Sequence, residues 1–210
     1  MSNPWNKTRS RNFAETRETR KVLVLCEDEK TAPNYFKKFP FNPEDVLVEV
    51  VGTGINTDSL VKEAIQRKEH AEQHGQKYIR IWCVFDRDSF PAQNFNEAFR
   101  LAEANGINVA YANQCFELWY WLHFDLQQTS VSRDEYGKKL SDRLGRKYQK
   151  NDTTLYDELK ALQPDAIRNC KKLLSFYNPC VPERNDPSTT VHTLVEFLNQ
   201  FETDGNFKKS

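Results

Sequence analysis

The first half of the chain alternates between short apolar runs and amphipathic segments, and this order limits the folds available to it. Residues 22–26 are apolar throughout, as in strands that are buried on both faces of a parallel sheet. Segments with a helical pattern follow the runs, and two of them end at Gly75 and Gly106. The alternation predicts an α/β fold in which a small parallel sheet is flanked by helices. We expect its strands at residues 22–26, 45–51, 78–85 and 107–112.

Beyond residue 113 the strand pattern gives way to helical segments without a repeat period. We therefore divide the chain into a basic, flexible N-terminal arm (1–20), an α/β domain (21–125) and a helical extension packed on that domain (126–210). The arm and residues 133–150 are locally basic, although the whole chain has 30 Lys and Arg against 30 Asp and Glu. A nucleic acid would therefore have to bind through local patches rather than through net charge.

The cysteine pattern and the absence of long apolar runs indicate the compartment. The five cysteines form no CxxC pair, so we expect reduced thiols rather than a disulfide framework or a zinc site. No apolar run reaches the roughly 18 residues of a membrane span, and the N-terminal sequence lacks the apolar core of a signal peptide. These features predict a soluble, cytoplasmic protein with no membrane contact.

Four acidic residues follow the predicted strands. Glu27 comes directly after the first strand, Asp86 and Asp88 after the third, and Glu117 just past the fourth. Ligands of open parallel sheets bind at the carboxyl ends of the strands, so these four side chains would face one crevice. Carboxylates brought together raise one another's pKa unless a cation compensates their charge. An all-oxygen ligand set suits Mg²⁺ or Mn²⁺ better than zinc.

Two of these acids and a glycine-containing loop also have ordinary structural interpretations. Asp88 precedes Pro91 and would serve as a turn residue or a helix cap. Glu117 would be favoured in the first turn of a helix by the helix dipole. The loop at residues 50–59 has the place of a phosphate cradle but lacks the residues of a P-loop, so we favour a turn in which Asn56 or Thr57 caps the next helix.

The motifs "VLCEDEK" and "VFDRD" resemble the Toprim pattern, a glutamate after the first strand and DxD after a later one, which topoisomerases, primases and OLD-type nucleases share. The sequence is more similar still to the RloB family of Toprim-like proteins, through "VLCEDEKTAPNYF", "CFELWYWLHF" and "PSTTVHTLVEFL", over roughly residues 21 to 200. Two positions depart from the family pattern, which usually has glycine at Asp28 and glutamate at Ala32. The resemblance implies a Toprim-like (Rossmann-like) fold with a helical C-terminal extension.

The resemblance also implies metal-dependent cleavage of phosphodiester bonds in DNA or RNA, including tRNA. Asp86 and Asp88 would hold Mg²⁺ or Mn²⁺, and Glu27 would bind a second ion or act as general acid or base. Glu117 would be an additional metal ligand, and Lys30 would reach the phosphate.

His192 is a further catalytic candidate, although a histidine on an otherwise apolar helix face more often serves packing. Members of the family occur beside restriction loci and with an AAA-type ATPase in bacterial abortive-infection systems. The resemblance therefore implies an ATPase partner and a role in defence against phage, and the sequence leaves self-association open.

Other functions compete with a nuclease. A nucleotide-sugar transferase or a phosphatase also uses DxD, but the first leaves Glu27 without a task and the second usually carries DxD on its first strand. A catalytically silent Toprim-like module that binds an ATPase or a nucleic acid is the other alternative. The intact acids argue against it, whereas Asp28 and Ala32 keep it open.

Overall fold

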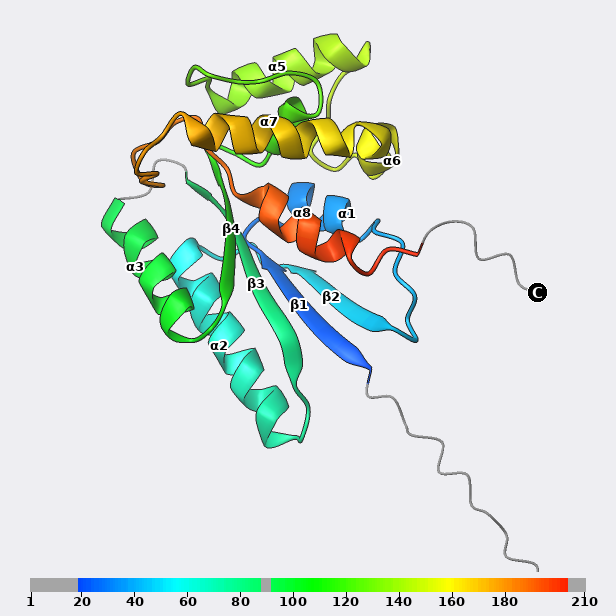
Figure 1. The fold of residues 1–210 in the computed structure, drawn as a ribbon, viewed down its shortest axis with the longest axis vertical. Coiled ribbons are helices and arrows are strands. Elements are labelled where there is room, and N and C mark those ends of the chain that lie inside the picture. The colour runs from blue at the N-terminus through cyan, green and yellow to red at the C-terminus, as the bar shows by residue number, and fades with distance from the viewer. Residues whose placement is uncertain (1–18, 88–91, 204–210) are drawn as a thin grey trace, which may run out of the picture.

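Four parallel strands form the centre of the molecule and confirm the predicted α/β fold (Figure 1). The computed structural model describes residues 19–87 and 92–203. Neighbouring strands are paired in the order β2-β1-β3-β4, so the first and third strands of the chain lie side by side. The strands are β1 (Arg20–Cys26), β2 (Val46–Gly52), β3 (Tyr78–Arg87) and β4 (Asn108–Asn113).

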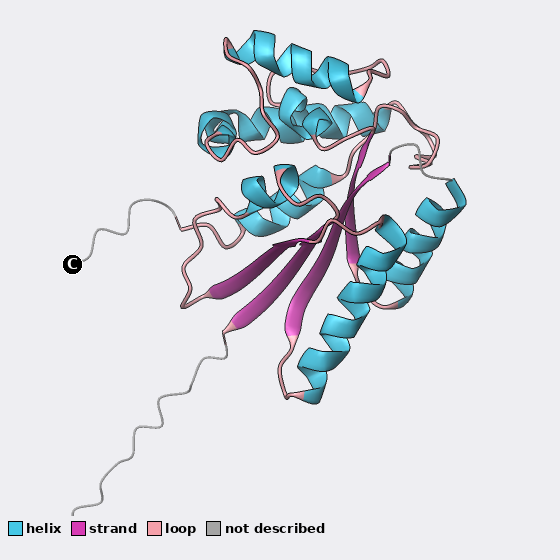
Figure 2. Ribbon diagram, turned by 180° about the vertical axis from the view of Figure 1, so that it is seen from behind, coloured by secondary structure: helices cyan, strands magenta, loops and turns pink. Residues whose placement is uncertain are grey.

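Helices cover both faces of this sheet, which explains the apolar character of its central strand. Successive side chains of a strand point to opposite faces. Leu23 and Leu25 of β1 accordingly pack with the side chains of α2 (Thr57–Gln73) and α3 (Ala92–Ala104). Val22, Val24 and Cys26 belong to the core on the other face. Figure 2 shows α2 and α3 on one side of the sheet and the remaining helices on the other.

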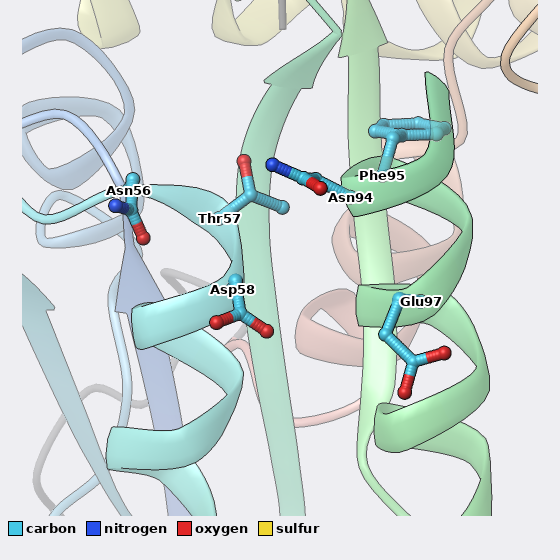
Figure 3. Close-up of a pocket in the computed structure, with 6 residues that line it drawn as sticks. All are labelled: Asn56, Thr57, Asp58, Asn94, Phe95 and Glu97. Carbon is cyan, nitrogen blue, oxygen red and sulfur yellow. The ribbon is translucent and has the colours of Figure 1, made fainter. Parts of the chain in front are cut away.

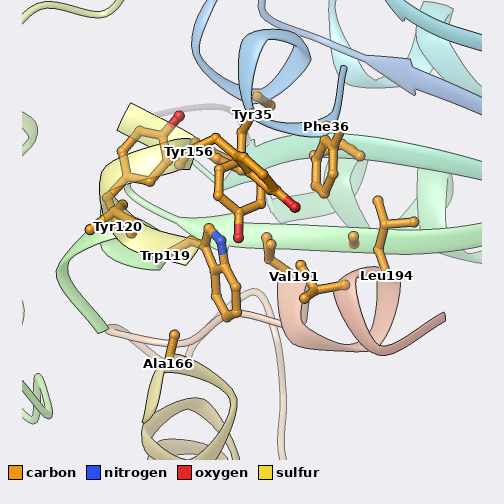
Figure 4. Close-up of a cluster of buried hydrophobic side chains, with 14 of the residues drawn as sticks. Tyr35, Phe36, Trp119, Tyr120, Tyr156, Ala166, Val191 and Leu194 are labelled. Carbon is orange, nitrogen blue, oxygen red and sulfur yellow. The ribbon is translucent and has the colours of Figure 1, made fainter. Parts of the chain in front are cut away.

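The second face is covered by α1 and by helices from the C-terminal half of the chain, which share one aromatic core with the sheet (Figure 4). Trp119 lies at its centre, with its ring 6.2 Å from that of Tyr35, and Tyr35 also packs at 5.1 Å against Tyr156. These helices are α1 (Thr31–Phe36), α4 (Glu117–Leu122), α5 (Arg133–Leu144), α6 (Leu155–Leu159) with the 3-10 turn Lys160–Leu162, α7 (Gln163–Ser175) and α8 (Val191–Asn199).

The segment before α8 also joins the sheet edge. Thr189 forms an isolated antiparallel bridge with Ala112 of β4, and Thr190 N–H donates to the carbonyl of Tyr111 at 2.9 Å. Helices from both sides of residue 125 contribute to one core. The division of the chain into domains at residues 20 and 125 stays a prediction. Among the residues that the structure describes, no helix combines the length and apolarity needed to cross a bilayer.

Candidate metal centre

Glu27 and Asp86 meet where two neighbouring strands end. β1 and β3 pair in register up to Cys26 and Val84. Glu27 N–H then donates to the carbonyl of Val84 at 2.8 Å, and Asp86 N–H donates to the carboxylate of Glu27, with 3.2 Å between N and Oε2. The parallel pairing of β1 with β3 therefore brings together two acids that lie 59 residues apart in the sequence.

β3 is longer than the sequence pattern predicted. Asp86 and Arg87 still belong to the strand, because Ala112 and Asn113 of β4 pair with them. Alternation along β3 then sends the two side chains to opposite faces of the sheet. Arg87 lies on the side of α3, with its guanidinium 5.6 Å from the centre of the Phe95 ring. Arg87 therefore separates the two aspartates of the DxD motif without sharing the face of Asp86.

Asp86 lies in an unusually acidic environment. Its side chain is 26% exposed, and burial is the main cause that raises its pKa well above the usual range. The charges of Glu117, Asp28 and Glu27 raise it further. Arg133 acts in the opposite direction, with 3.7 Å between its guanidinium nitrogen and Asp86 Oδ2. The charges of three other acids, among them Asp28, which the sequence did not indicate, thus act on Asp86, and the predicted crevice of Glu27, Asp86, Asp88 and Glu117 as a whole stays a prediction.

Glu117 lies in the first turn of α4 and is only 3% exposed. The hydroxyl of Tyr148 donates to Glu117 Oε1 at 3.0 Å. Burial and the charge of Glu117 raise the pKa of Tyr148 well above its usual value, so this hydroxyl stays protonated and remains a donor at neutral pH. The structure therefore confirms Glu117 as a first-turn acid of α4 whose charge also acts on Asp86, and its role as a metal ligand stays a prediction.

Asp28 serves a different purpose from the other acids. Its carboxylate accepts hydrogen bonds from the backbone N–H groups of Lys30, Thr31 and Ala32, at 2.8, 2.5 and 3.1 Å. Burial raises the pKa of Asp28, and these three backbone bonds lower it. The Asp28 side chain therefore caps α1, and the backbone N–H groups at the start of this helix are bonded to its carboxylate.

The loop between β2 and α2 holds the Glu27 segment from the other side. Gly54 N–H donates to the carbonyl of Glu27 at 2.9 Å, and Gly54 has a φ of 66°, which favours glycine. A Cβ atom at Gly52 would lie 2.7 Å from the Cα of Glu29. Asn56 caps α2 by accepting from Ser59 N–H at 3.0 Å, which confirms the interpretation of this loop as a turn.

A cavity of about 240 Å³ adjoins this loop between the starts of α2 and α3 (Figure 3). The Thr57 side chain links the cavity to the acids, because its hydroxyl donates to Glu27 Oε2 at 3.2 Å. Asn94 extends toward Thr57 from α3 in Figure 3. The described residues of the lining include the carboxylates of Asp58 and Glu97 and neither Lys nor Arg, so these residues do not form an anion site.

Asp88, the second acid of DxD, lies outside the described residues, and its role as a ligand stays a prediction. Lys30 is exposed, and it is the N-cap residue that directly precedes α1. His192 lies in α8 on the face that packs against α7, with its Nδ1 atom 3.1 Å from the Cys170 sulfur. His192 is 6% exposed, and burial lowers its pKa. The structure thus gives His192 a packing environment, and its catalytic role stays a prediction.

The donor set can be compared with the needs of the expected cation. Within residues 19–87 and 92–203, no three His, Cys, Asp or Glu side chains are grouped so that they could hold one ion. Mg²⁺ usually takes one or two carboxylates together with waters and substrate phosphates, whereas structural zinc requires four protein ligands. The two carboxylates of Glu27 and Asp86 therefore match the number that Mg²⁺ usually takes and fall short of the four ligands of structural zinc, and binding of Mg²⁺ or Mn²⁺ stays a prediction.

Several contributors to this centre could not be found from sequence spacing. Arg133 and Tyr148 come from the helical part and reach the acids only through tertiary packing. The locally basic stretch 133–150 was the one available signal for Arg133. Thr57 was assigned as a possible cap, and its bond to Glu27 was not anticipated.

Comparisons with known proteins agree with this geometry at the level of the family. The family model described as RloB-like protein matches residues 22–198, which include both strand ends and helices α1 to α7. No curated protein and no solved structure matches the chain significantly. The match spans most of the 210 residues and confirms the resemblance found in the sequence motifs, and the chain therefore belongs to the RloB-like protein family.

Proposed function

We propose that this protein is a metal-dependent nuclease of the Toprim type that cleaves phosphodiester bonds in DNA or RNA. The observation that carries the proposal is the direct contact between the Asp86 backbone and the Glu27 carboxylate at adjacent strand ends. Asp28 and Glu117 add negative charge around this contact. Such an acidic crevice at the carboxyl edge of a parallel sheet is suited to a divalent cation and a phosphate substrate.

Some side chains of the centre would bind the metal ion, and others orient these ligands. Asp86 and Glu27 would hold Mg²⁺ or Mn²⁺, together with the predicted ligand Asp88 and with Glu117 nearby. The bound ion would polarise the scissile phosphate and stabilise negative charge on it. Thr57 O–H and the Asp86 N–H fix the orientation of Glu27. Lys30, the N-cap residue of α1, would contact the phosphate.

The biological setting of the proposal comes from the family resemblance. We infer that the nuclease acts in a bacterial anti-phage or abortive-infection system with an AAA-type ATPase that is encoded nearby. Its substrate would be DNA or tRNA, bound partly by the beginning of the basic stretch 133–150. That stretch begins beside the acids, because Arg133 is the first residue of α5 and contacts Asp86.

A cleavage assay tests the proposal. Plasmid DNA and tRNA are incubated with the protein in Mg²⁺ or Mn²⁺, with and without the ATPase, and D86A is compared with the wild type. We expect D86A to lose at least about 100-fold in rate, as expected when a metal ligand is removed. D142A is the matched control, since Asp142 is exposed on α5 and should leave the rate unchanged. Equal cleavage by D86A and the wild type would refute the site.

One observation favours a catalytically silent binding module as a second candidate. The carboxylate of Asp28 occupies the N–H groups at the start of α1, where the family pattern has glycine. A glycine would leave those N–H groups open to a substrate phosphate. If the module is silent for this reason, the wild type cleaves nothing under any condition and D28G gains activity. Cleavage by the wild type alone would exclude this candidate.

A further inference from the structure

Arg133 forms an ionic contact with Asp86 of the acidic centre. It is the first residue of α5, and its side chain is 41% exposed. One guanidinium nitrogen donates to the carbonyl of Gln114 at 2.9 Å and lies 3.7 Å from Asp86 Oδ2. Arg133 therefore reaches the Asp86 carboxylate from the helical part of the chain.

Gln114, whose carbonyl accepts the hydrogen bond from Arg133, has an unusual backbone conformation. Gln114 is the one described non-glycine residue with a positive φ, at 67°. That region disfavours side chains other than those of glycine, asparagine and aspartate. The backbone N–H of Gln114 donates to the carbonyl of Arg87 at 2.9 Å, and its side-chain Nε2 donates to the carboxylate of Asp186 at 2.8 Å. The backbone just after β4 is therefore constrained so that its carbonyl presents an acceptor to Arg133.

The contact with Asp86 is too long to explain this arrangement as an ion pair alone. Strong charge-assisted bonds between nitrogen and oxygen measure about 2.7–2.9 Å, and exposed ion pairs contribute little to stability. Of these two contacts, the one with the Gln114 carbonyl is the hydrogen bond, at 2.9 Å, whereas the one with Asp86 is a longer ionic contact at 3.7 Å. A built-in support that keeps an arginine near an acidic centre indicates a role beyond neutralising one carboxylate.

We propose that Arg133 is a phosphate-binding residue of this centre, which offsets part of the charge of Asp86 in the metal-free protein and binds a substrate phosphate once a divalent cation occupies Asp86. The inference rests on the proposed function. A cation bound at Asp86 repels the guanidinium, while the arriving phosphate attracts it. The planar guanidinium fork matches two phosphate oxygens, which a lysine ammonium does not. Arg133 and the metal ion therefore compete for Asp86 and cooperate at the substrate.

This relationship predicts that one substitution changes two affinities in opposite directions. The variants are R133M, R133K and the matched control R143M. Arg143 lies on the same helix, exposed, with its guanidinium 5.1 Å from the centre of the Phe124 ring. Mn²⁺ binding is followed by the loss of the free-ion EPR signal. Oligonucleotide binding is followed by the anisotropy of a short fluorescein-labelled DNA and its RNA counterpart, with Ca²⁺ in place of Mg²⁺.

We expect R133M to bind Mn²⁺ about fivefold more tightly, since the competing cation is gone, and to bind the oligonucleotide at least about tenfold more weakly. R133K should recover the wild-type Mn²⁺ affinity but only part of the oligonucleotide affinity, because it keeps the charge and loses the fork. R133M affinities that match those of R143M would overturn the inference and leave a surface ion pair. Tighter Mn²⁺ binding with unchanged oligonucleotide binding would overturn the phosphate role.

The failure of the proposed function has a different signature. In that case the wild type would bind no Mn²⁺, or D86A would bind it as well as the wild type does, and the inference would fall with the metal site. Specific Mn²⁺ binding that D86A abolishes, combined with R133M behaving like R143M, would refute the role of Arg133 alone.

Discussion

The backbone N–H of Asp86 donates to the carboxylate of Glu27, and this bond links the ends of β1 and β3. The same carboxylate oxygen accepts from the hydroxyl of Thr57 at the start of α2. Three elements of the chain therefore set the position of Glu27 before any ligand binds. A preorganised carboxylate of this kind loses little conformational freedom on metal binding, which favours affinity.

The substitution E27Q separates the structural role of this carboxylate from its role as a ligand. The amide oxygen of glutamine can still accept from Asp86 N–H and the Thr57 hydroxyl, so the free energy of unfolding in EDTA should change by less than about 1 kcal/mol. Saturating Mg²⁺ should stabilise the wild type by about 2.7 kcal/mol at 100 times its dissociation constant. We expect E27Q to lose most of this gain, as measured by urea unfolding with and without Mg²⁺.

The control for E27Q is E29Q in the same loop, because Glu29 is exposed. E29Q should keep the wild-type response to Mg²⁺. An E27Q protein that Mg²⁺ still stabilises as strongly as the wild type would contradict the assignment of Glu27 as a ligand.

The raised pKa of Asp86 makes stability depend on pH in a defined direction. Burial, followed by Glu117, Asp28 and Glu27, raises this pKa in the folded protein. The folded state then binds a proton that the unfolded state releases, so Asp86 contributes stability below its unfolded pKa of about 3.9 and loses that contribution as the pH rises through the folded pKa. D86N removes the charge and should therefore stabilise the metal-free protein at pH 7.

Each unit by which the folded pKa is raised corresponds to about 1.4 kcal/mol of this effect at pH 7. Urea unfolding in EDTA at pH 7 and near pH 4 measures it, and the advantage of D86N should shrink toward the lower pH. D142N provides the control, since Asp142 is exposed. A D86N protein that is less stable than the wild type at pH 7 would show that Asp86 does not carry an uncompensated charge.

Sequence patterns predicted the sheet and its acidic edge because both depend on local signals. The continuous apolar run of β1 identified a strand buried on both faces, and the position of Glu27 followed from the end of that run. The extension of β3 through Arg87 could not be predicted, because it depends on how far β4 supplies pairing partners. The cap formed by Asp28 had a local signal, an aspartate three residues before a helix start, which was interpreted only as a departure from the family pattern.

The helical part was predictable as helices but not as a source of site residues. Arg133 and Tyr148 reach the centre from residues that follow the sheet in the sequence, through packing of α5 on α4 and of α4 on β4. No periodicity in a single sequence reports which exposed face of such a helix meets the sheet. The same limit applies to Glu117, whose burial under Tyr148 is a tertiary contact.

Removal of the Tyr148 hydroxyl tests the support of Glu117. Y148F leaves a buried carboxylate oxygen without its donor, and we expect a loss of about 1–3 kcal/mol in the free energy of unfolding. The matched control is Y78F, because the Tyr78 hydroxyl bonds the exposed Glu49 at 3.3 Å. Y78F should lose less than about 0.5 kcal/mol. Equal losses in urea titrations of the two variants would contradict a special role of the Glu117 bond.

His192 offers a test that distinguishes packing from catalysis. Its ring is buried in α8 against Cys170, so H192A should create a cavity and reduce the free energy of unfolding by about 2–4 kcal/mol. The cleavage rate per folded molecule, measured well below the unfolding transition, should stay within about twofold of the wild type. H74A, at the exposed histidine that directly follows α2, should change neither quantity. A large loss of rate without a loss of stability would instead support the catalytic role.

Two glycine substitutions contrast a crowded position near the centre with an open one. A Cβ at Gly52 would meet backbone atoms of Glu29 and Asp28 at 2.7 and 2.8 Å, so G52A should cost about 1–3 kcal/mol and displace the loop that carries Glu27. Gly137 lies inside α5, and its Cβ would meet only a Tyr148 ring carbon at 4.0 Å. G137A should therefore stabilise the protein by about 0.5–1 kcal/mol. The Mn²⁺ affinity should fall in G52A and remain unchanged in G137A, as measured by EPR titration of the folded proteins. A G52A protein with wild-type stability and Mn²⁺ affinity would show that the two loops are not packed as tightly as their contacts indicate.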